Sequence, residues 1–214
     1  KIFRIKHAIP VAAIPARKTE MVVKKLNEAF PEFIPAVSAI ETSFNNIGAV
    51  FHPSITILNL SRIEATMGNF QFYIEGVTQS VAKILEAVDE ERMKVAKSLK
   101  CASIYSAIEW LSMAYNVVED NLFDAIHSNP GYVGIMAPRT INVRYITEDV
   151  PMSLVPISEF GRMFGVETKV IDSLINIANS IFKKDFRSTG RNLKKLGLEG
   201  LSLKEIRDIF INGR

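Results

Sequence analysis

The pattern of apolar and polar positions divides the chain near residue 41 into two parts with different periodicities. Before that point, between Phe3 and Ala16, short apolar runs broken by prolines (Ile9-Pro-Val-Ala-Ala-Ile-Pro15) are typical of a buried strand and its exit loop. Residues 19–30 carry apolar side chains at helical spacing, and residues 33–40 form a second short run. Strand, helix and strand in this order predict part of a parallel α/β sheet.

Single residues set the expected ends of these elements. Thr19 is the expected N-cap of the helix over 19–30, and Pro31 is expected to stop that helix. Pro35 weakens the prediction of the second strand, because proline cannot donate a hydrogen bond to a sheet ladder.

After residue 41 the apolar spacing is helical almost throughout. The expected helices cover residues 53–67, 77–88, 90–99, 103–115, 155–164, 168–182 and 202–211. Pro53 is expected at the first helical position of its helix, and Asp89 is expected to cap the helix that follows it. Ser202 and Glu205 have the spacing of a capping box, whereas residues 128–146 are the least regular part. The pattern therefore predicts a mainly α protein, with an all-helical domain preceded by the last strand-helix-strand of an α/β domain.

Composition and charge exclude several classes of protein. Hydrophobic residues make up 48% of the 214 residues, which is enough for a folded core. No apolar run reaches the length of a membrane span, about eighteen residues. The net charge is only +3 with mixed signs, and the basic stretch at 183–195 lacks interleaved aromatics. That stretch favours a solvated surface over a nucleic-acid-binding one.

The few cysteines and histidines argue against a metal centre. Cys101 is the only cysteine, so no internal disulfide is expected and the cytoplasm is the default compartment. The three histidines, His7, His52 and His127, are too scattered for a zinc cluster. The chain begins with Lys1 and shows no leader, which we expect of a fragment or a processed chain.

His52 is the first candidate for chemistry. It precedes Pro53, which is expected to open a helix, so its imidazole would lie at the positive end of the helix dipole, where the neutral form is favoured. A nearby carboxylate would act in the opposite direction and fix the tautomer. A histidine under both influences suits general acid or base catalysis near neutral pH. The structural alternative is a partly buried histidine that caps a helix.

A second candidate group lies in one six-residue window that contains Arg144, Glu148 and Asp149. The planar fork of an arginine matches a carboxylate, so an α-keto acid or an amino acid is a natural ligand. Asp149 can orient His52 and stabilise its protonated form. The alternative is an ordinary helix start before Pro151, with acids in the first turn facing the dipole.

Several short motifs occur in order between residues 45 and 197. They are Asn45-Asn46, His52-Pro53, Leu58-Asn59, Phe72-Tyr-Ile-Glu-Gly76, Asp89-Glu-Glu-Arg92, Tyr132-Val-Gly-Ile-Met-Ala-Pro138, Arg144-Tyr-Ile-Thr-Glu-Asp-Val-Pro151, Gly190-Arg191 and Leu196-Gly197. With these motifs the chain resembles the C-terminal domain of the octopine/nopaline (opine) dehydrogenase family. Residues 1–44 look like the last strand-helix-strand of that family's nucleotide-binding domain, so the resemblance covers essentially the whole chain.

The resemblance implies a domain division and a reaction. Residues 45–214 would be a helical substrate-binding and catalytic domain, and residues 1–44 the truncated end of a Rossmann-type domain. The implied reaction is the NAD(P)H-dependent reductive condensation of an α-keto acid with the amine of an amino acid. The sequence contains no Gly-x-Gly-x-x-Gly, so NAD or NADP would be bound mainly by an N-terminal domain outside this chain. We therefore expect the chain alone to be inactive.

The resemblance also implies residue roles. His52 would donate a proton to the keto oxygen, or to the hydroxyl that leaves as the imine forms, and Asp149 would be its partner. Arg144 would bind a substrate carboxylate, and Asn45 and Tyr132 are further candidates for substrate binding. The implied partners are a keto acid and an amino acid. An exposed strand edge and apolar helices are compatible with a homodimer.

Two other functions stay open from the sequence. A helical dimerisation or protein-interaction module would have no reason to bring His52, Arg144 and Asp149 into one cleft. A simple 2-keto acid reductase would pair similar domains but would rely on a lysine for proton transfer, and no lysine here has an equivalent local context. Trp110, on a helical stripe, is expected to pack in the core or at a domain interface.

Overall fold

The N-terminal part of the chain forms the predicted strand-helix-strand unit. The computed structural model describes residues 5–213. Strand β1 (Ile9–Val11) and strand β2 (Phe33–Pro35) are parallel, and helix α1 (Thr19–Leu26) lies between them in the chain. The register pairs Ile9 with Phe33, Pro10 with Ile34 and Val11 with Pro35. A parallel pair needs such a crossover connection, because a tight hairpin reverses the chain.

The strand predicted over residues 33–40 is wrong beyond Pro35. The Ala36 N–H still donates to the Val11 carbonyl at 2.8 Å, but helix α2 (Ala39–Phe44) begins three residues later. The expected apolar run at the start of the chain begins at Phe3, and residues 3 and 4 lie outside the described residues.

The helix predicted over residues 19–30 is shorter, and its expected cap is wrong. Lys18 occupies the N-cap, and Thr19 is the first residue of α1. The Thr19 hydroxyl accepts a hydrogen bond from the Ala13 N–H at 3.0 Å. This contact joins the loop after β1 to α1. The Thr19 hydroxyl therefore makes a tertiary hydrogen bond and does not cap the helix.

Two helices replace the single one predicted over residues 53–67. They are α3 (Gly48–Leu58) and α4 (Leu60–Thr66). Asn59 separates them, and its amide donates to the Ile55 and Gly76 carbonyls at 2.9 Å each. This side chain therefore ends α3 and fixes it to the loop that follows α4.

Pro53 lies inside α3, so its predicted place at the first helical position is wrong. A proline inside a helix costs about 3 kcal/mol, mainly through a lost hydrogen bond and a steric clash. Val50 and Phe51, which precede it, are 0% and 2% exposed. Burial of each large apolar side chain contributes about 1.5–3 kcal/mol, which offsets the cost of the proline.

One long helix, α5 (Gln79–Ser98), replaces the two predicted over 77–88 and 90–99. Asp89 is buried inside this helix, so its predicted role as a cap is wrong. Its Oδ1 accepts from Arg92 Nε and Nη2 at 2.9 and 2.6 Å, and its Oδ2 accepts from the Ala107 N–H at 2.7 Å. The ion pair compensates the charge, so the helix continues through the acid.

Among residues 5–213, Arg92 is the largest side chain that is fully buried, with 0% exposure. Besides bonding to Asp89, it donates to the carbonyls of Phe44 and Tyr105, the latter at 2.6 Å. The guanidinium thereby joins α2, α5 and the segment before the next helix.

The remaining elements follow in chain order after the turn η1 (Ala16–Lys18), which precedes α1. They are α6 (Ala107–Tyr115), α7 (Leu122–His127), α8 (Arg144–Thr147), the π-helical turn η2 (Val150–Leu154), α9 (Val155–Met163), α10 (Lys169–Phe182), α11 (Phe186–Thr189) and α12 (Leu203–Asn212). The predicted helix 168–182 is confirmed as α10. The predicted capping box of Ser202 and Glu205 is confirmed at the start of α12. Ser106 caps α6, so that helix begins later than predicted.

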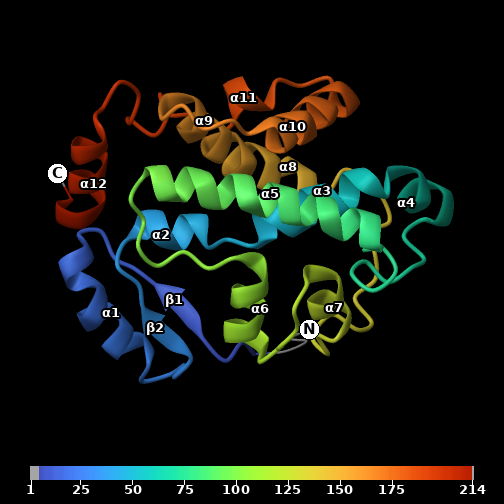
Figure 1. Cartoon of the computed structure of the whole chain (residues 1–214), viewed down its shortest axis with the longest axis horizontal. Coiled ribbons are helices and arrows are strands. Elements are labelled where there is room, and N and C mark those ends of the chain that lie inside the picture. The colour runs from blue at the N-terminus through green and yellow to red at the C-terminus, as the bar shows by residue number, and fades with distance from the viewer. Residues whose placement is uncertain (1–4, 214) are drawn as a thin grey trace.

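Helices α3 and α5 pack against each other at the centre of the molecule. Figure 1 shows α9, α10 and α11 on one side of α5, and α6, α7 and the β1-α1-β2 unit on the other. Helix α12 returns to contact η1, so the end of the chain packs on its beginning. The fold is mainly α with a small parallel sheet, as predicted. Within residues 5–213 no helix is both long and apolar enough to cross a bilayer.

Candidate functional site

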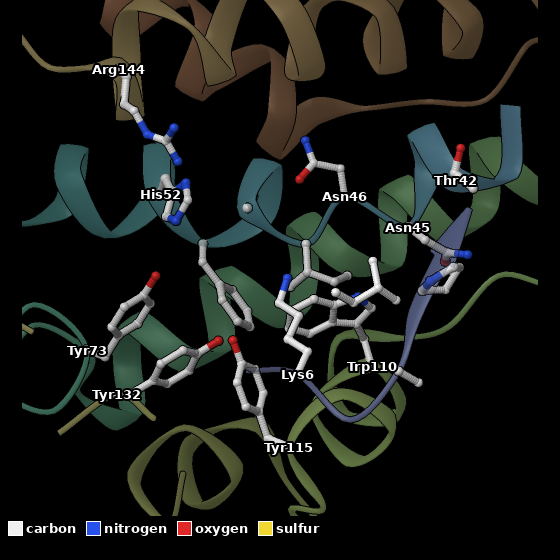
Figure 2. A pocket seen from close by; sticks show the side chains of 16 residues that line it. Lys6, Thr42, Asn45, Asn46, His52, Tyr73, Trp110, Tyr115, Tyr132 and Arg144 are labelled. Atoms are coloured by element: carbon white, nitrogen blue, oxygen red, sulfur yellow. The ribbon is translucent and has the colours of Figure 1, made fainter. Parts of the chain in front are cut away.

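A pocket of about 470 Å³ lies between the segment that leads into β1, the first turns of α3 and a group of aromatic side chains. Figure 2 shows the side chains that line it. The lining residues are Lys6, Ala8, Ile9, Pro10, Thr42, Asn45, Asn46, Ile47, Gly48, Phe51, His52, Tyr73, Trp110, Tyr115, Tyr132 and Arg144. Four of the five predicted site residues are among them, and the fifth, Asp149, lies directly behind His52.

His52 and Asp149 form a hydrogen-bonded pair in the wall of this pocket. The distance from His52 Nδ1 to Asp149 Oδ2 is 2.8 Å, and the two side chains are 17% and 13% exposed. A carboxylate accepts from Nδ1–H, so this contact fixes the tautomer of the ring. No described residue bonds to Nε2, which is therefore the nitrogen available to a ligand.

The expectation that His52 lies at a helix start is wrong, because α3 begins at Gly48. His52 is one turn inside the helix, and its own carbonyl accepts from the Thr56 hydroxyl at 2.7 Å. The helix dipole acts mainly within the terminal turn. Two influences on the imidazole were expected, the helix dipole and a neighbouring carboxylate. The geometry establishes only the carboxylate.

The imidazole is also held by an aromatic stack. The ring of Tyr145 lies 4.3 Å from that of His52, with 21° between the planes. Tyr145 packs in turn on Phe72, with ring centroids 5.0 Å apart. Asp149 on one edge and Tyr145 on one face leave the ring a single orientation, which general acid catalysis requires.

Asp149 is positioned by an unusual helix. It directly precedes η2, in which the Val155 N–H reaches the Val150 carbonyl five residues back. Such π-helical turns are rare in proteins, and those that occur are often found at functional sites. The next donor would be residue 156, which is a proline without an N–H. The Pro151 carbonyl is therefore left open within the helix.

The Gly190-Arg191 pair closes this gap. The Arg191 N–H donates to the Pro151 carbonyl at 2.9 Å. A Cβ at residue 190 would lie 2.4 Å from that same oxygen, so only glycine allows the approach. The motif thus supports the turn that carries Asp149, which gives a physical reason for a pair that is weak as a sequence signal.

Arg144 begins α8 and turns its guanidinium toward the pocket near His52 (Figure 2). Within the described part of the chain, this guanidinium has neither a hydrogen bond nor an ion pair. An arginine that keeps its planar fork of donors open can bind a carboxylate through two parallel hydrogen bonds.

Tyr73 and Tyr132 form a stacked pair in the pocket wall, with ring centroids 3.9 Å apart. Phe51 contacts both edge-on, with centroids 6.5 Å away. Burial raises the pKa of Tyr73 and of Tyr132 above the usual value. Both are therefore neutral near pH 7 and can act as hydrogen-bond donors but not as charges. Tyr132 was predicted, whereas Tyr73 was quoted only within a motif.

Asn45 lines the pocket, but the protein backbone engages its amide group. Its Nδ2 donates to the Ser103 carbonyl at 2.8 Å, and its Oδ1 accepts from the Tyr105 N–H at 3.0 Å. This bracket fixes the segment before α6 to the end of α2. A role for Asn45 in substrate binding stays a prediction.

Lys6 and Trp110 were not predicted for the site. The Lys6 ammonium lies 4.6 Å from the centroid of the Trp110 ring, and both side chains line the pocket. Trp110 therefore has more than the packing role expected of it. A lysine beside an indole is a known cation–π arrangement, but residues 6 and 110 are too distant in sequence for any local pattern to indicate it.

The sequence has no Gly-x-Gly-x-x-Gly, the glycine-rich turn that holds a pyrophosphate at a helix start in many dinucleotide-binding domains. Among residues 5–213, no group of three or more His, Cys, Asp or Glu side chains is placed to hold a metal ion.

Comparison with known proteins decides the family. The protein-family model described as NAD/NADP octopine/nopaline dehydrogenase, alpha-helical domain, matches residues 35–182, well over half of the chain. The chain belongs to the octopine/nopaline dehydrogenase family. The resemblance drawn from the sequence motifs is thus confirmed.

Two relatives illustrate this membership. An opine dehydrogenase of Arthrobacter sp. (strain 1C) is 38% identical over 203 residues, which covers 95% of this chain and 56% of that protein. The protein ocs of Agrobacterium tumefaciens (strain Ach5) is 29% identical over 164 residues, covering 76% of this chain and 45% of that protein. The chain thus spans about half the length of these two relatives.

Solved structures of octopine dehydrogenase have the same fold. The complex with NADH and agmatine matches with a TM-score of 0.67 at 23% identity, over 90% of this chain and 54% of that one. The complex with NADH and L-arginine matches with a TM-score of 0.66 over the same shares. The fold described above is therefore that of the helical domain of the octopine/nopaline dehydrogenase family.

Proposed function

We propose that this chain supplies the substrate-binding and proton-transfer half of an opine-type dehydrogenase. The reaction is the NAD(P)H-dependent reductive condensation of an α-keto acid with an amino acid. One observation carries the proposal: the His52–Asp149 pair, at 2.8 Å, opens into the same pocket as the Arg144 guanidinium, which forms no ion pair with any described residue. Membership of the octopine/nopaline dehydrogenase family supports it.

The proposed roles follow from what each side chain leaves open. Arg144 binds the carboxylate of the keto acid through its free fork and so holds the carbonyl carbon near His52. Protonated His52 donates from Nε2 to the keto oxygen as the amine attacks, takes up a proton that the amine gives up, and donates it to the hydroxyl, which leaves as water as the imine forms. Asp149 stabilises the imidazolium before the transfer and fixes its orientation afterwards.

We place the dinucleotide outside these residues. The cofactor, bound as NADH or NADPH, would supply the hydride that reduces the imine, and the octopine dehydrogenase structures with a similar fold contain NADH. Residues 1–44 are proposed to end a Rossmann-type domain and residues 45–214 to form the substrate domain. The parallel β1-α1-β2 unit supports this division, because it is the repeating unit of such domains.

The geometry of the pocket argues against the two alternative functions, an interaction module and a simple keto acid reductase, to different degrees. A non-catalytic interaction module would not need an imidazole, its carboxylate and a free guanidinium around one pocket. A simple keto acid reductase gains some support from Lys6, a lysine in the pocket that sequence reasoning did not identify. The His52–Asp149 pair, however, already provides a proton donor, so Lys6 is free for another role.

The test is a rate measurement with the complete protein. NADH and NADPH oxidation is followed with an α-keto acid alone, an amino acid alone and both together, and products are identified by mass spectrometry. We expect oxidation only when both substrates are present, with a secondary amine as product. Equal oxidation with the keto acid alone and a hydroxy acid product would establish the reductase instead. No oxidation with any pair would favour the interaction module.

A further inference from the structure

Lys6 occupies a position in the pocket that its local contacts do not explain. It enters from the segment before β1, and its ammonium rests over the Trp110 ring at 4.6 Å. Burial lowers the pKa of Lys6, which means that the surroundings do not compensate its charge. Within the described residues this ammonium has no ion pair and no hydrogen bond, so its three N–H donors are open.

The pocket is electrostatically one-sided. Its sixteen lining residues, all from the described part of the chain, include two basic side chains, Lys6 and Arg144, and no aspartate or glutamate. By contrast, Lys25, Lys94 and Lys169 each have a glutamate beside them, at 2.6, 3.4 and 2.7 Å. A partly buried cation without an anion is costly, and an anionic ligand removes that cost. The lining is therefore suited to a ligand with two negative groups.

The two cations reach the pocket from different elements. Figure 2 shows Arg144 descending from α8 and Lys6 rising from the N-terminal segment, with His52 between them in this view. The product of the proposed reaction has matching chemistry, because its secondary amine joins two carbon atoms that each carry a carboxylate. If Arg144 holds the carboxylate from the keto acid, the carboxylate from the amino acid is left for the other cation.

We infer that Lys6 binds the α-carboxylate of the amino-acid substrate and thereby selects α-amino acids over amines that lack a carboxylate. This inference rests on the proposed function and names a determinant of its specificity. Trp110 positions Lys6, because its ring holds the ammonium without using an acceptor that would compete with the substrate.

The inference is tested by binding, in the absence of cofactor. Trp110 is the only tryptophan of the chain, so its fluorescence reports on ligands next to Lys6. The full chain is titrated with N-(1-carboxyethyl)phenylalanine and with N-(1-carboxyethyl)phenethylamine. The two probes share one carboxylate, the secondary amine and the aromatic group, and differ only in the α-carboxylate.

We expect the native chain to bind the dicarboxylate at least about tenfold more tightly than the monocarboxylate, the usual size of one charge-assisted contact. Lys6→Met should bring this ratio close to one, whereas Lys6→Arg should keep most of it. Lys24→Met, which removes an exposed lysine of α1 away from the pocket, is the matched control and should keep the native ratio.

The outcomes separate this inference from the proposed function. A ratio that Lys6→Met leaves at the native value overturns the inference, even if NADH oxidation requires both substrates. A ratio that collapses only in Lys6→Met supports it, even if no oxidation is found. If the native chain binds neither probe, the inference is also overturned. Thermal unfolding of each variant shows whether the fold is retained.

Discussion

Two of the ion pairs in this molecule, Arg92–Asp89 and His52–Asp149, differ in how many of their hydrogen-bonding atoms have a partner within the protein. Arg92 and Asp89 are buried, and both carboxylate oxygens and the three guanidinium nitrogens have partners within α2, α5 and the start of α6. His52 and Asp149 share one hydrogen bond, and no described residue bonds to Nε2. The nitrogens and carboxylate oxygens of the first pair all bond to protein groups, whereas the second pair leaves one nitrogen, Nε2, open to the pocket.

The difference distinguishes a structural pair from a functional one. A saturated pair contributes to the fold only, because no donor or acceptor is left for a ligand. A pair with one open position can transfer a proton, and the neighbouring Arg144 and Lys6 follow the same pattern of open donors. Counting unused hydrogen-bond capacity is therefore a better guide to the site than the presence of charge.

The comparison is tested most severely by Asp149→Asn. An amide cannot stabilise an imidazolium and can favour the wrong tautomer, so we expect kcat to fall by about 10²–10⁴-fold. The folding free energy should change less than in a variant that leaves a buried charge unpaired, because asparagine keeps the shape of aspartate and carries no charge. Steady-state kinetics and thermal unfolding of the same preparation measure both. A variant that loses stability but not kcat would make this pair structural.

Arg92→Met should give the opposite pattern. It leaves the buried Asp89 carboxylate without its cation, which typically costs about 3–5 kcal/mol of unfolding free energy. Denaturant unfolding measures the loss. For molecules that stay folded at low temperature, the affinity for the dicarboxylate probe should match the native value. An unchanged unfolding free energy would contradict the structural role of the saturated pair.

Arg144→Gln removes one of the open cations and should have a smaller effect. Loss of a charge-assisted contact of about 1.5–3 kcal/mol corresponds to an increase of about 10–150-fold in KM for the keto acid. The KM for the amino acid should change much less. Lys6→Met should show the reverse split, so the pair of variants assigns the two carboxylates. Equal changes in both KM values would reject separate sites.

The smallest effect is a pH dependence. Burial lowers the pKa of Lys6, so the fraction of protonated ammonium falls at a lower pH than for an exposed lysine. Affinity for the dicarboxylate probe should decline as the pH rises through that pKa, by up to about tenfold as one charge-assisted contact is lost. Lys6→Arg should remove the decline, because a guanidinium stays protonated. A decline that persists in Lys6→Arg would assign it to another group.

Local signals in the sequence predicted the elements whose ends depend on local contacts. The helix over 168–182 and the capping box of Ser202 were predictable because the deciding contacts lie within a few residues. The predictions for Pro53 and Asp89 were wrong because tertiary contacts decide both positions. Buried neighbours hold Pro53 inside α3, and Arg92 holds Asp89 inside α5.

The site shows the same limit. His52 and Asp149 are 97 residues apart, so their contact could be inferred only through the family resemblance and not from spacing. Lys6 and Trp110 had no motif to indicate them, because a cation–π contact across the fold leaves no periodic trace. Tyr73 was part of a recognised motif, but its place in the pocket depends on the stack with Tyr132.

The geometry of η2 shows how a π-helical turn can arise or disappear. Each residue of an α-helix advances the chain by about 100° around the axis, and a π turn holds one residue more than an α turn. Because the turn takes up its extra residue within itself, deleting one residue from 150–154 would make the Val155–Val150 contact an ordinary α-helical hydrogen bond, with Asp149 and α9 in their present orientation. Inserting one residue into an α-helix is therefore enough to create such a turn beside the carboxylate that bonds to His52.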